Sequence, residues 1–188
     1  MRQSAKYLGL IGVPLLLWSA GLASAQTRPD TKPHYHSRRE LEVVAALSPR
    51  LDEMTLMQVA TYCAEYGGPT ARTVNVTMNE WRVRNGPQIA VATYYVGRLE
   101  HDAAHAEDEA SRKSYRKILN GTPNTAKTIA DQQIRYIEEA RAQQGARAGE
   151  EVCLSYFKRV ASGDSDIRQR DPELAAFLDE GIPKETAR

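Results

Sequence analysis

The chain has 188 residues, of which 41% are hydrophobic, and its 25 basic and 24 acidic residues give a formal net charge of +1 at pH 7. This near balance excludes the strongly basic surface typical of nucleic-acid-binding proteins and the polybasic patch that attracts proteins to anionic membranes. The length suits one domain with its own hydrophobic core and is too short for two.

The N-terminus has the three parts of a secretory signal peptide. Arg2 and Lys6 supply positive charge, an apolar run extends from Leu8 to Trp18, and Ala23-Ser24-Ala25 fits the small-residue cleavage rule. The alternative is an uncleaved membrane anchor, because spanning a bilayer takes roughly 17–25 apolar residues. Polar residues and a glycine interrupt the second half of the run, so we expect cleavage before Gln26.

This interpretation divides the chain into four segments: a signal peptide (1–25), a flexible lead-in (26–36), a helical domain (37–181) and a C-terminal tail (182–188). The positively charged start lacks paired arginines, which favours the Sec route over the twin-arginine route. We therefore expect a mature chain from Gln26 to Arg188 in the periplasm or outside the cell. We expect no stable membrane insertion after cleavage and no nucleic-acid partner.

Two cysteines, Cys63 and Cys153, remain after cleavage. An even number of cysteines in an exported chain favours a disulfide bond, because the compartment is oxidising. The alternatives are two buried free thiols or an intermolecular bridge. We expect the intramolecular bond.

A first helix is predicted to begin after Ser37, because Ser37 and Glu40 have the spacing of a capping box. A new helix could open at Ser48-Pro49, since proline is tolerated at the first helical position. The next stretch places five residues on one helical face before Gly67-Gly68-Pro69 ends it: Leu56, Val59, Ala60, Cys63 and Tyr66.

Residues 70–85 fit either a helix face or an alternating strand. We predict a helix, because no partner strand is evident elsewhere. Asn85-Gly86-Pro87 is then expected to form a turn. The next helix is predicted over 88–119, with a strict three-four spacing of apolar residues, and Asn120-Gly121-Thr122-Pro123 is expected to stop it.

Helical character resumes over 125–161, although Gly145 and Gly149 weaken its middle by about 1 kcal/mol each relative to alanine. A last short helix opens at Asp171-Pro172 and closes by Gly181. The predicted fold is therefore all-α: a small antiparallel bundle of about four to six helices with one disulfide.

The disulfide conflicts with a regular up-down bundle. A hairpin at 120–123 would place Cys153 opposite roughly Ala90. A straight helix over 70–85 would then leave Cys63 about 15–20 Å from Cys153, at about 1.5 Å per residue. A disulfide needs α-carbons within about 7 Å. Either 70–85 crosses obliquely or the last long helix breaks near Gly145–Gly149.

The sequence contains no recognisable nucleophile, phosphate-binding, dinucleotide, haem or calcium motif, and so we expect no enzyme activity and no cofactor. The best metal candidate is the pair His101 and His105, which lie one turn apart on a helix, with Asp108 as a third ligand. The competing interpretation is an ordinary solvated helix face, since the pair lacks a fixed fourth ligand.

A second cluster, Trp81-Arg82-Val83-Arg84-Asn85, combines residue types that are enriched at interaction hot spots. We favour a structural role, because Trp81 lies in phase with Val74 and Met78 on the apolar face.

From these observations we expect a non-enzymatic periplasmic protein that acts by interaction or as a structural element, such as an adaptor, an inhibitor or a chaperone-like factor. Its partner would be an envelope protein that the sequence does not identify. The alternative is an envelope protein that binds a metal or small ligand through His101 and His105.

Overall fold

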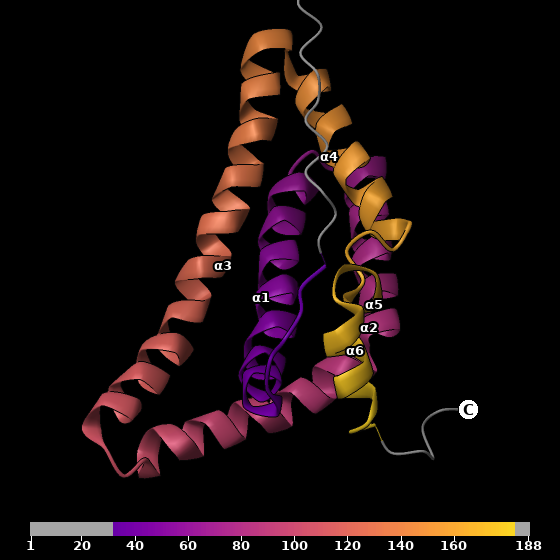
Figure 1. Cartoon of the computed structure of the whole chain (residues 1–188). Helices are drawn as coiled ribbons and strands as arrows, with labels where there is room; N and C mark the ends of the chain where they lie inside the picture. Colours follow the sequence, from indigo (N-terminus) through magenta and orange to yellow (C-terminus); the bar gives the residue numbers. More distant parts are fainter. Residues whose placement is uncertain (1–31, 183–188) are drawn as a thin grey trace, which may run out of the picture. The chain divides into compact units, whose positions relative to one another are not determined.

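The computed structural model describes residues 32–182, which form six helices and no strand. The helices are α1 (Arg38–Ala64), α2 (Gly68–His105), α3 (Glu109–Gln144), α4 (Ala146–Ala161), α5 (Ile167–Arg170) and α6 (Pro172–Asp179) (Figure 1). The prediction of an all-α bundle is confirmed, and residues 70–85 are helical. The predicted signal peptide and most of the tail lie outside the described residues.

The start of α1 has the predicted capping box. Ser37 Oγ accepts a hydrogen bond from the Glu40 amide at 3.1 Å, and the Glu40 carboxylate accepts one from the His36 amide at 2.9 Å. The helix then continues through Pro49, so no new helix opens there. It ends in a tight turn at Gly67, whose φ of 73° favours glycine.

Two predicted turns are wrong. Pro87 lies inside α2 and Pro123 lies inside α3, so 88–119 is not one helix and no hairpin forms at 120–123. A proline inside a helix removes one hydrogen bond and costs roughly 3 kcal/mol or more. Here apolar side chains pack into the core on both sides of each proline, and this burial offsets the cost.

The chain turns at two other places. The first is the corner between α2 and α3, where Asp108 caps α3 by accepting a hydrogen bond from the Ser111 amide at 2.7 Å. The second is Gly145, which separates α3 from α4 with a φ of 90°. The break near Gly145–Gly149, one of the two alternatives that the disulfide left open, is therefore present.

The buried residues form two clusters. The disulfide core joins parts of α1, α2, α3 and α4, and its buried members are Leu56, Val59, Ala60, Cys63, Val74, Met78, Trp81, Ala130, Ile137, Cys153, Phe157 and Val160. The α6 core joins α1, α2, α5 and α6 through Ala45, Ala46, Val91, Ala92, Tyr95, Leu99, Ile167, Leu174, Ala175, Phe177 and Leu178. Ile89 packs against both clusters.

Each of the three long helices crosses the boundary between the cores close to its internal proline. Residues before Pro49 in α1 belong to the α6 core, and those after it belong to the disulfide core. In α2 the order is reversed about Pro87. In α3, Tyr115 and Leu119 pack on the α6 core, whereas residues beyond Pro123 pack on the disulfide core.

Cys63 of α1 and Cys153 of α4 are bonded, with α-carbons 5.7 Å apart and 90 residues between them in sequence. Both are fully buried. Gly149 lies one turn before Cys153, and its α-carbon faces the Tyr66 hydroxyl, the Arg141 side chain and the Ile137 carbonyl. A glycine at this position allows the close approach of α3, α4 and the end of α1.

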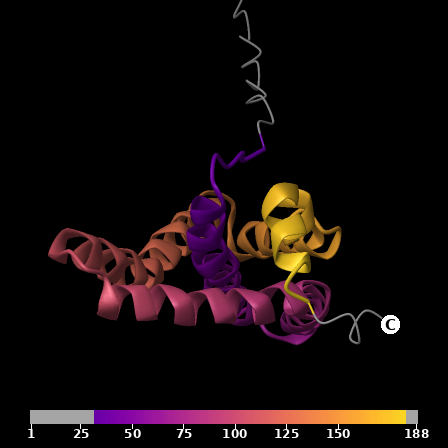
Figure 2. The same ribbon diagram turned by 60° about the horizontal axis from the view of Figure 1, so that its bottom comes forward.

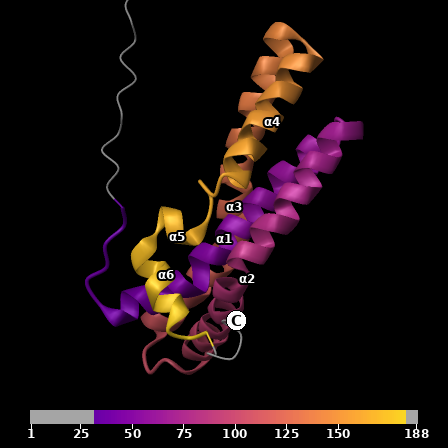
Figure 3. The same ribbon diagram turned by 90° about the vertical axis from the view of Figure 1, so that its right-hand side faces the viewer.

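Figures 1 and 2 both place α1 between α3 and α4, which diverge from their shared turn at Gly145. Figure 3 shows α1 running alongside the first part of α2. Although α3 spans 36 residues, it buries only Ala126, Ala130 and Ile137. One side of α3 is therefore left facing a hollow. None of the helices within 32–182 combines the length and hydropathy needed to cross a membrane.

Candidate functional site

An open groove lies between α3 and α4, with α1 at its floor. It consists of one hollow of about 650 Å³ and a second of about 400 Å³, which share Gln133, Tyr156 and Arg159. We call this the α3–α4 groove. Its lining comes from Ser48, Leu51, Asp52, Thr55 and Leu56 of α1, Ile129, Gln133, Tyr136, Ile137, Ala140 and Gln144 of α3, Ala148, Glu151, Val152, Ser155, Tyr156, Lys158 and Arg159 of α4, and Asp164, Ser165 and Arg170 beyond α4.

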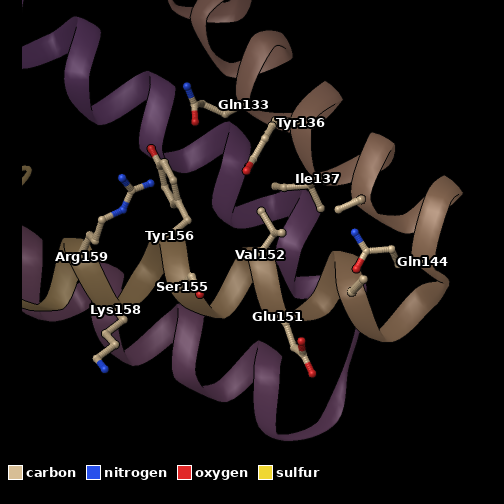
Figure 4. Close-up of a pocket in the computed structure, with 12 residues that line it drawn as sticks. Gln133, Tyr136, Ile137, Gln144, Glu151, Val152, Ser155, Tyr156, Lys158 and Arg159 are labelled. Atoms are coloured by element: carbon tan, nitrogen blue, oxygen red, sulfur yellow. The ribbon is translucent and has the colours of Figure 1, made fainter. Parts of the chain in front are cut away.

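Helical periodicity brings these side chains to the groove. The α3 residues from Gln133 to Gln144 and the α4 residues from Ala148 to Arg159 recur at intervals of three and four, which places each set on one face of its helix. Figure 4 shows Tyr136 reaching from α3 toward the space above α4, with Val152 and Tyr156 rising from α4. The two faces therefore look into the same hollow.

Near the Gly145 turn the lining combines apolar and aromatic side chains with the polar side chains of Gln144, Glu151 and Ser155. Ile137 is buried in the disulfide core and Val152 packs against that core, whereas Tyr136 is 64% exposed. Tyr156 lies at the junction of the two hollows, and its burial raises the pKa of its hydroxyl above the ordinary value. The hydroxyl is therefore a neutral hydrogen-bonding group at neutral pH.

The other end of the groove contains a charged pair. Asp52 of α1 accepts a hydrogen bond from Arg170 of α5 at 2.5 Å. Burial raises the pKa of the Asp52 carboxyl, and the nearby Arg170 guanidinium counteracts part of that rise. The pair closes this end of the groove with its charges neutralised.

Arg159 lies between the apolar end and this pair. Its guanidinium carbon is 5.9 Å from the centre of the Tyr156 ring, a distance at which a cation and an aromatic face attract each other. Arg159 forms no ion pair with any residue between 32 and 182. Lys158 also lines the groove and forms no ion pair within residues 32–182, so two cations of the groove lack an acidic partner there, and Arg159 is the one beside an aromatic ring.

The predicted metal residues lie along the chain at the corner between α2 and α3, where the two histidines contact each other. The His101 and His105 rings are stacked with centroids 4.2 Å apart, and Nδ1 of His105 lies 2.9 Å from the His101 carbonyl oxygen. Asp108 caps α3, and its hydrogen bonds with Ser111 lower the pKa of its carboxyl. Over residues 32–182, no three side chains of the His, Cys, Asp and Glu types are grouped as a metal ion requires.

The Trp81 cluster lies at the boundary between the two cores. Trp81 is fully buried, and its indole nitrogen donates a hydrogen bond to the Ser165 carbonyl at 3.0 Å. Arg84 donates to Asp166 at 2.8 Å and to the Val160 carbonyl at 2.8 Å, and the Asp166 bond raises the pKa of the guanidinium. These contacts fasten the loop after α4 onto α2.

Asn85 completes this attachment. Its side-chain amide donates to Asp166 at 3.1 Å, and its oxygen accepts a hydrogen bond from the Ile167 amide at 2.9 Å. Arg82 points elsewhere and donates to Glu53 of α1 at 3.1 Å. Trp81 and Asn85 are buried and Arg84 holds the loop after α4, which is a structural role, whereas Val83 is 78% exposed.

Sequence reasoning missed the α3–α4 groove. Tyr136, Tyr156 and Arg159 are not among the residues that the sequence predicts as site residues. The available signal was the matching three-four spacing on either side of Gly145. That spacing predicts one helix face before Gly145 and one after it, but it does not predict that the two helices diverge.

Comparison with protein-family models, with curated proteins and with solved structures gives no match to this chain.

Proposed function

We propose that this protein is exported and works as a non-enzymatic interaction protein, in the manner of an adaptor, an inhibitor or a chaperone-like factor. The observation that carries the proposal is the α3–α4 groove, in which the exposed Tyr136, the apolar Val152 and the cation of Arg159, unpaired within residues 32–182, line the same hollow. Proteins commonly bind segments of other proteins in such grooves between helices. The partner is expected to be a protein of the envelope.

The export half of the proposal rests on the first 25 residues. Intact mass of protein purified from the envelope measures it directly. A chain beginning at Gln26 is the expected result, whereas a mass that retains residues 1–25 contradicts cleavage.

The binding half can be tested with a pair of matched tyrosines. Tyr136 lines the groove and is 64% exposed, and Tyr94 lies on α2 outside the groove and is 63% exposed. A displayed peptide library is selected on the oxidised mature protein, and the affinity of each selected peptide is measured for Tyr136→Ser and for Tyr94→Ser. Aromatic anchors at interfaces are worth about 1–2 kcal/mol, so binding should weaken about tenfold in Tyr136→Ser alone.

Both variants replace exposed side chains and should fold, which thermal melts can verify. Selected peptides that bind both variants as tightly as the parent protein would remove the groove as the binding site. A library that yields no binder would contradict the proposal as a whole.

A further inference from the structure

The shape of the α3–α4 groove favours a helical occupant over an extended one. Its α4 wall runs from Ala148 to Arg159, which corresponds to about 16 Å of helix. Both walls are helix faces with three-four spacing, into which the ridge of a third helix can pack. The part of the chain from 32 to 182 has no strand, and so an extended peptide would find no sheet edge to satisfy its backbone amides. A helix of about three turns satisfies its own backbone and matches the length.

The charges of the groove favour an acidic side chain on that helix. Asp52 is paired with Arg170 at 2.5 Å, and Glu151 is paired with Arg147 at 3.0 Å. Lys158 points away from α3 in Figure 4, whereas the Arg159 side chain rises beside Tyr156. The cation available to an occupant is therefore Arg159.

The position of the acidic residue follows from the other end of the groove. Asp164 lines the smaller hollow and accepts a hydrogen bond from Ser162 at 3.1 Å. A second carboxylate placed near Asp164 would be repelled. An occupant is thus favoured when its carboxylate faces the junction at Arg159 and its apolar residues lie toward the Gly145 turn.

We infer that the α3–α4 groove binds an amphipathic helix of another protein, with apolar residues against Tyr136 and Val152 and a carboxylate paired with Arg159. This inference rests on the proposed interaction function and specifies the chemical class of the partner.

The experiment uses two designed helical peptides of about 15 residues with the same leucine stripe. One carries a single glutamate beside the stripe, and the other carries glutamine at that position. Affinities are measured for the oxidised mature protein, for Arg159→Gln and for Arg135→Gln, which removes an exposed charge of α3 that lines neither hollow of the groove. A charge-assisted hydrogen bond at a partly desolvated site corresponds to a preference of about tenfold or more for glutamate over glutamine.

The inference predicts this preference in the parent protein and in Arg135→Gln, and its loss in Arg159→Gln. Equal binding of both peptides, with loss in Tyr136→Ser, would overturn the carboxylate pairing and leave the proposed function standing. Failure of both peptides to bind, while library peptides bind in a Tyr136-dependent way, would overturn the helical occupant alone. Failure of the library as well would remove the proposed function together with the inference.

Discussion

The disulfide core and the α6 core are stabilised by different interactions. The disulfide core holds the largest fully buried side chains, Trp81 and Phe157, and a covalent bond ties α1 to α4 through its centre. The α6 core packs alanines of α1 against two short helices. The stability of the disulfide core therefore depends less on surface contacts than the stability of the α6 core does.

The α6 core relies more on polar contacts at its edge. Asp171 caps α6 by accepting from the Leu174 amide at 2.9 Å, and it also accepts a hydrogen bond from the Tyr35 hydroxyl. Burial and the Asp171 hydrogen bond raise the pKa of Tyr35, which keeps this donor protonated. A single buried carboxylate thus joins the segment before α1 to the last helix.

The largest expected losses in the free energy of unfolding come from replacing one buried phenylalanine in each core by alanine. Phe157 is fully buried in the disulfide core, and Phe177 is 6% exposed in the α6 core, where it contacts Tyr95. Phe→Ala in a core costs about 3–5 kcal/mol. We expect Phe157→Ala to reach this range and Phe177→Ala to fall at its lower end, as measured by urea unfolding. A larger loss of unfolding free energy for Phe177→Ala than for Phe157→Ala would mean that the α6 core contributes more to stability than the disulfide core.

Removing the disulfide should have the next largest effect. Its loop of 90 residues corresponds to about 4.6 kcal/mol by the chain-entropy relation, although measured disulfides usually contribute about 2–4 kcal/mol. We expect Cys63→Ser with Cys153→Ser to lower the free energy of unfolding by about 2–4 kcal/mol, and hydrogen exchange to increase first in the disulfide core. A uniform increase over both cores would show that they unfold as one unit.

A pair of helical glycines should give effects of opposite sign. Gly149→Ala in the disulfide core would bring its β-carbon into the Tyr66 hydroxyl and within 3.0 Å of the Arg141 β-carbon. Such overpacking costs about 1–3 kcal/mol. Gly97→Ala in α2 meets nothing within 4 Å and should instead stabilise the helix by up to about 1 kcal/mol. Thermal melts of the two variants distinguish these outcomes, and stabilisation by both would mean that Tyr66 moves freely.

The smallest expected effect is a pH dependence from Asp52 at the boundary of the groove. Burial raises the pKa of this carboxyl in the folded protein above its ordinary value of 3.8. In the pH range just above 3.8 the folded state therefore binds more protons than the unfolded state, and the free energy of unfolding falls as the pH rises. Asp52→Asn lacks this dependence.

Urea unfolding of both proteins between about pH 3 and pH 6 measures the difference. The parent protein should lose stability relative to Asp52→Asn as the pH rises. A gain over the same range would mean that the attraction of Arg170 exceeds the cost of burying Asp52.

Much of the fold could be predicted from the sequence, because apolar periodicity and capping are local. The Ser37 cap and the turn at Gly67 needed only neighbouring residues, and the helical state of residues 70–85 needed only the absence of a partner strand elsewhere. The disulfide conflicted with a regular up-down bundle and left two alternatives, an oblique crossing of residues 70–85 or a break near Gly145, and the structure has the break.

The errors arose where packing outweighs local preference. Pro87 and Pro123 resemble helix ends, yet burial on both sides keeps α2 and α3 continuous. The corner between α2 and α3 lies at Asp108, which caps α3. From the sequence alone, this residue is instead a candidate metal ligand. The groove was missed because the divergence of α3 from α4 depends on the positions of those turns.

The bond between Cys63 and Cys153 has a mechanical consequence. It makes the intervening residues a closed ring, and α2 and α3 lie wholly within that ring. Tension applied at the two ends of the chain would pass from α1 through the sulfur atoms to α4, and the ring would carry none of it. Stretching the oxidised chain should therefore release about 300 Å less length than stretching the reduced chain, at roughly 3.4 Å per residue.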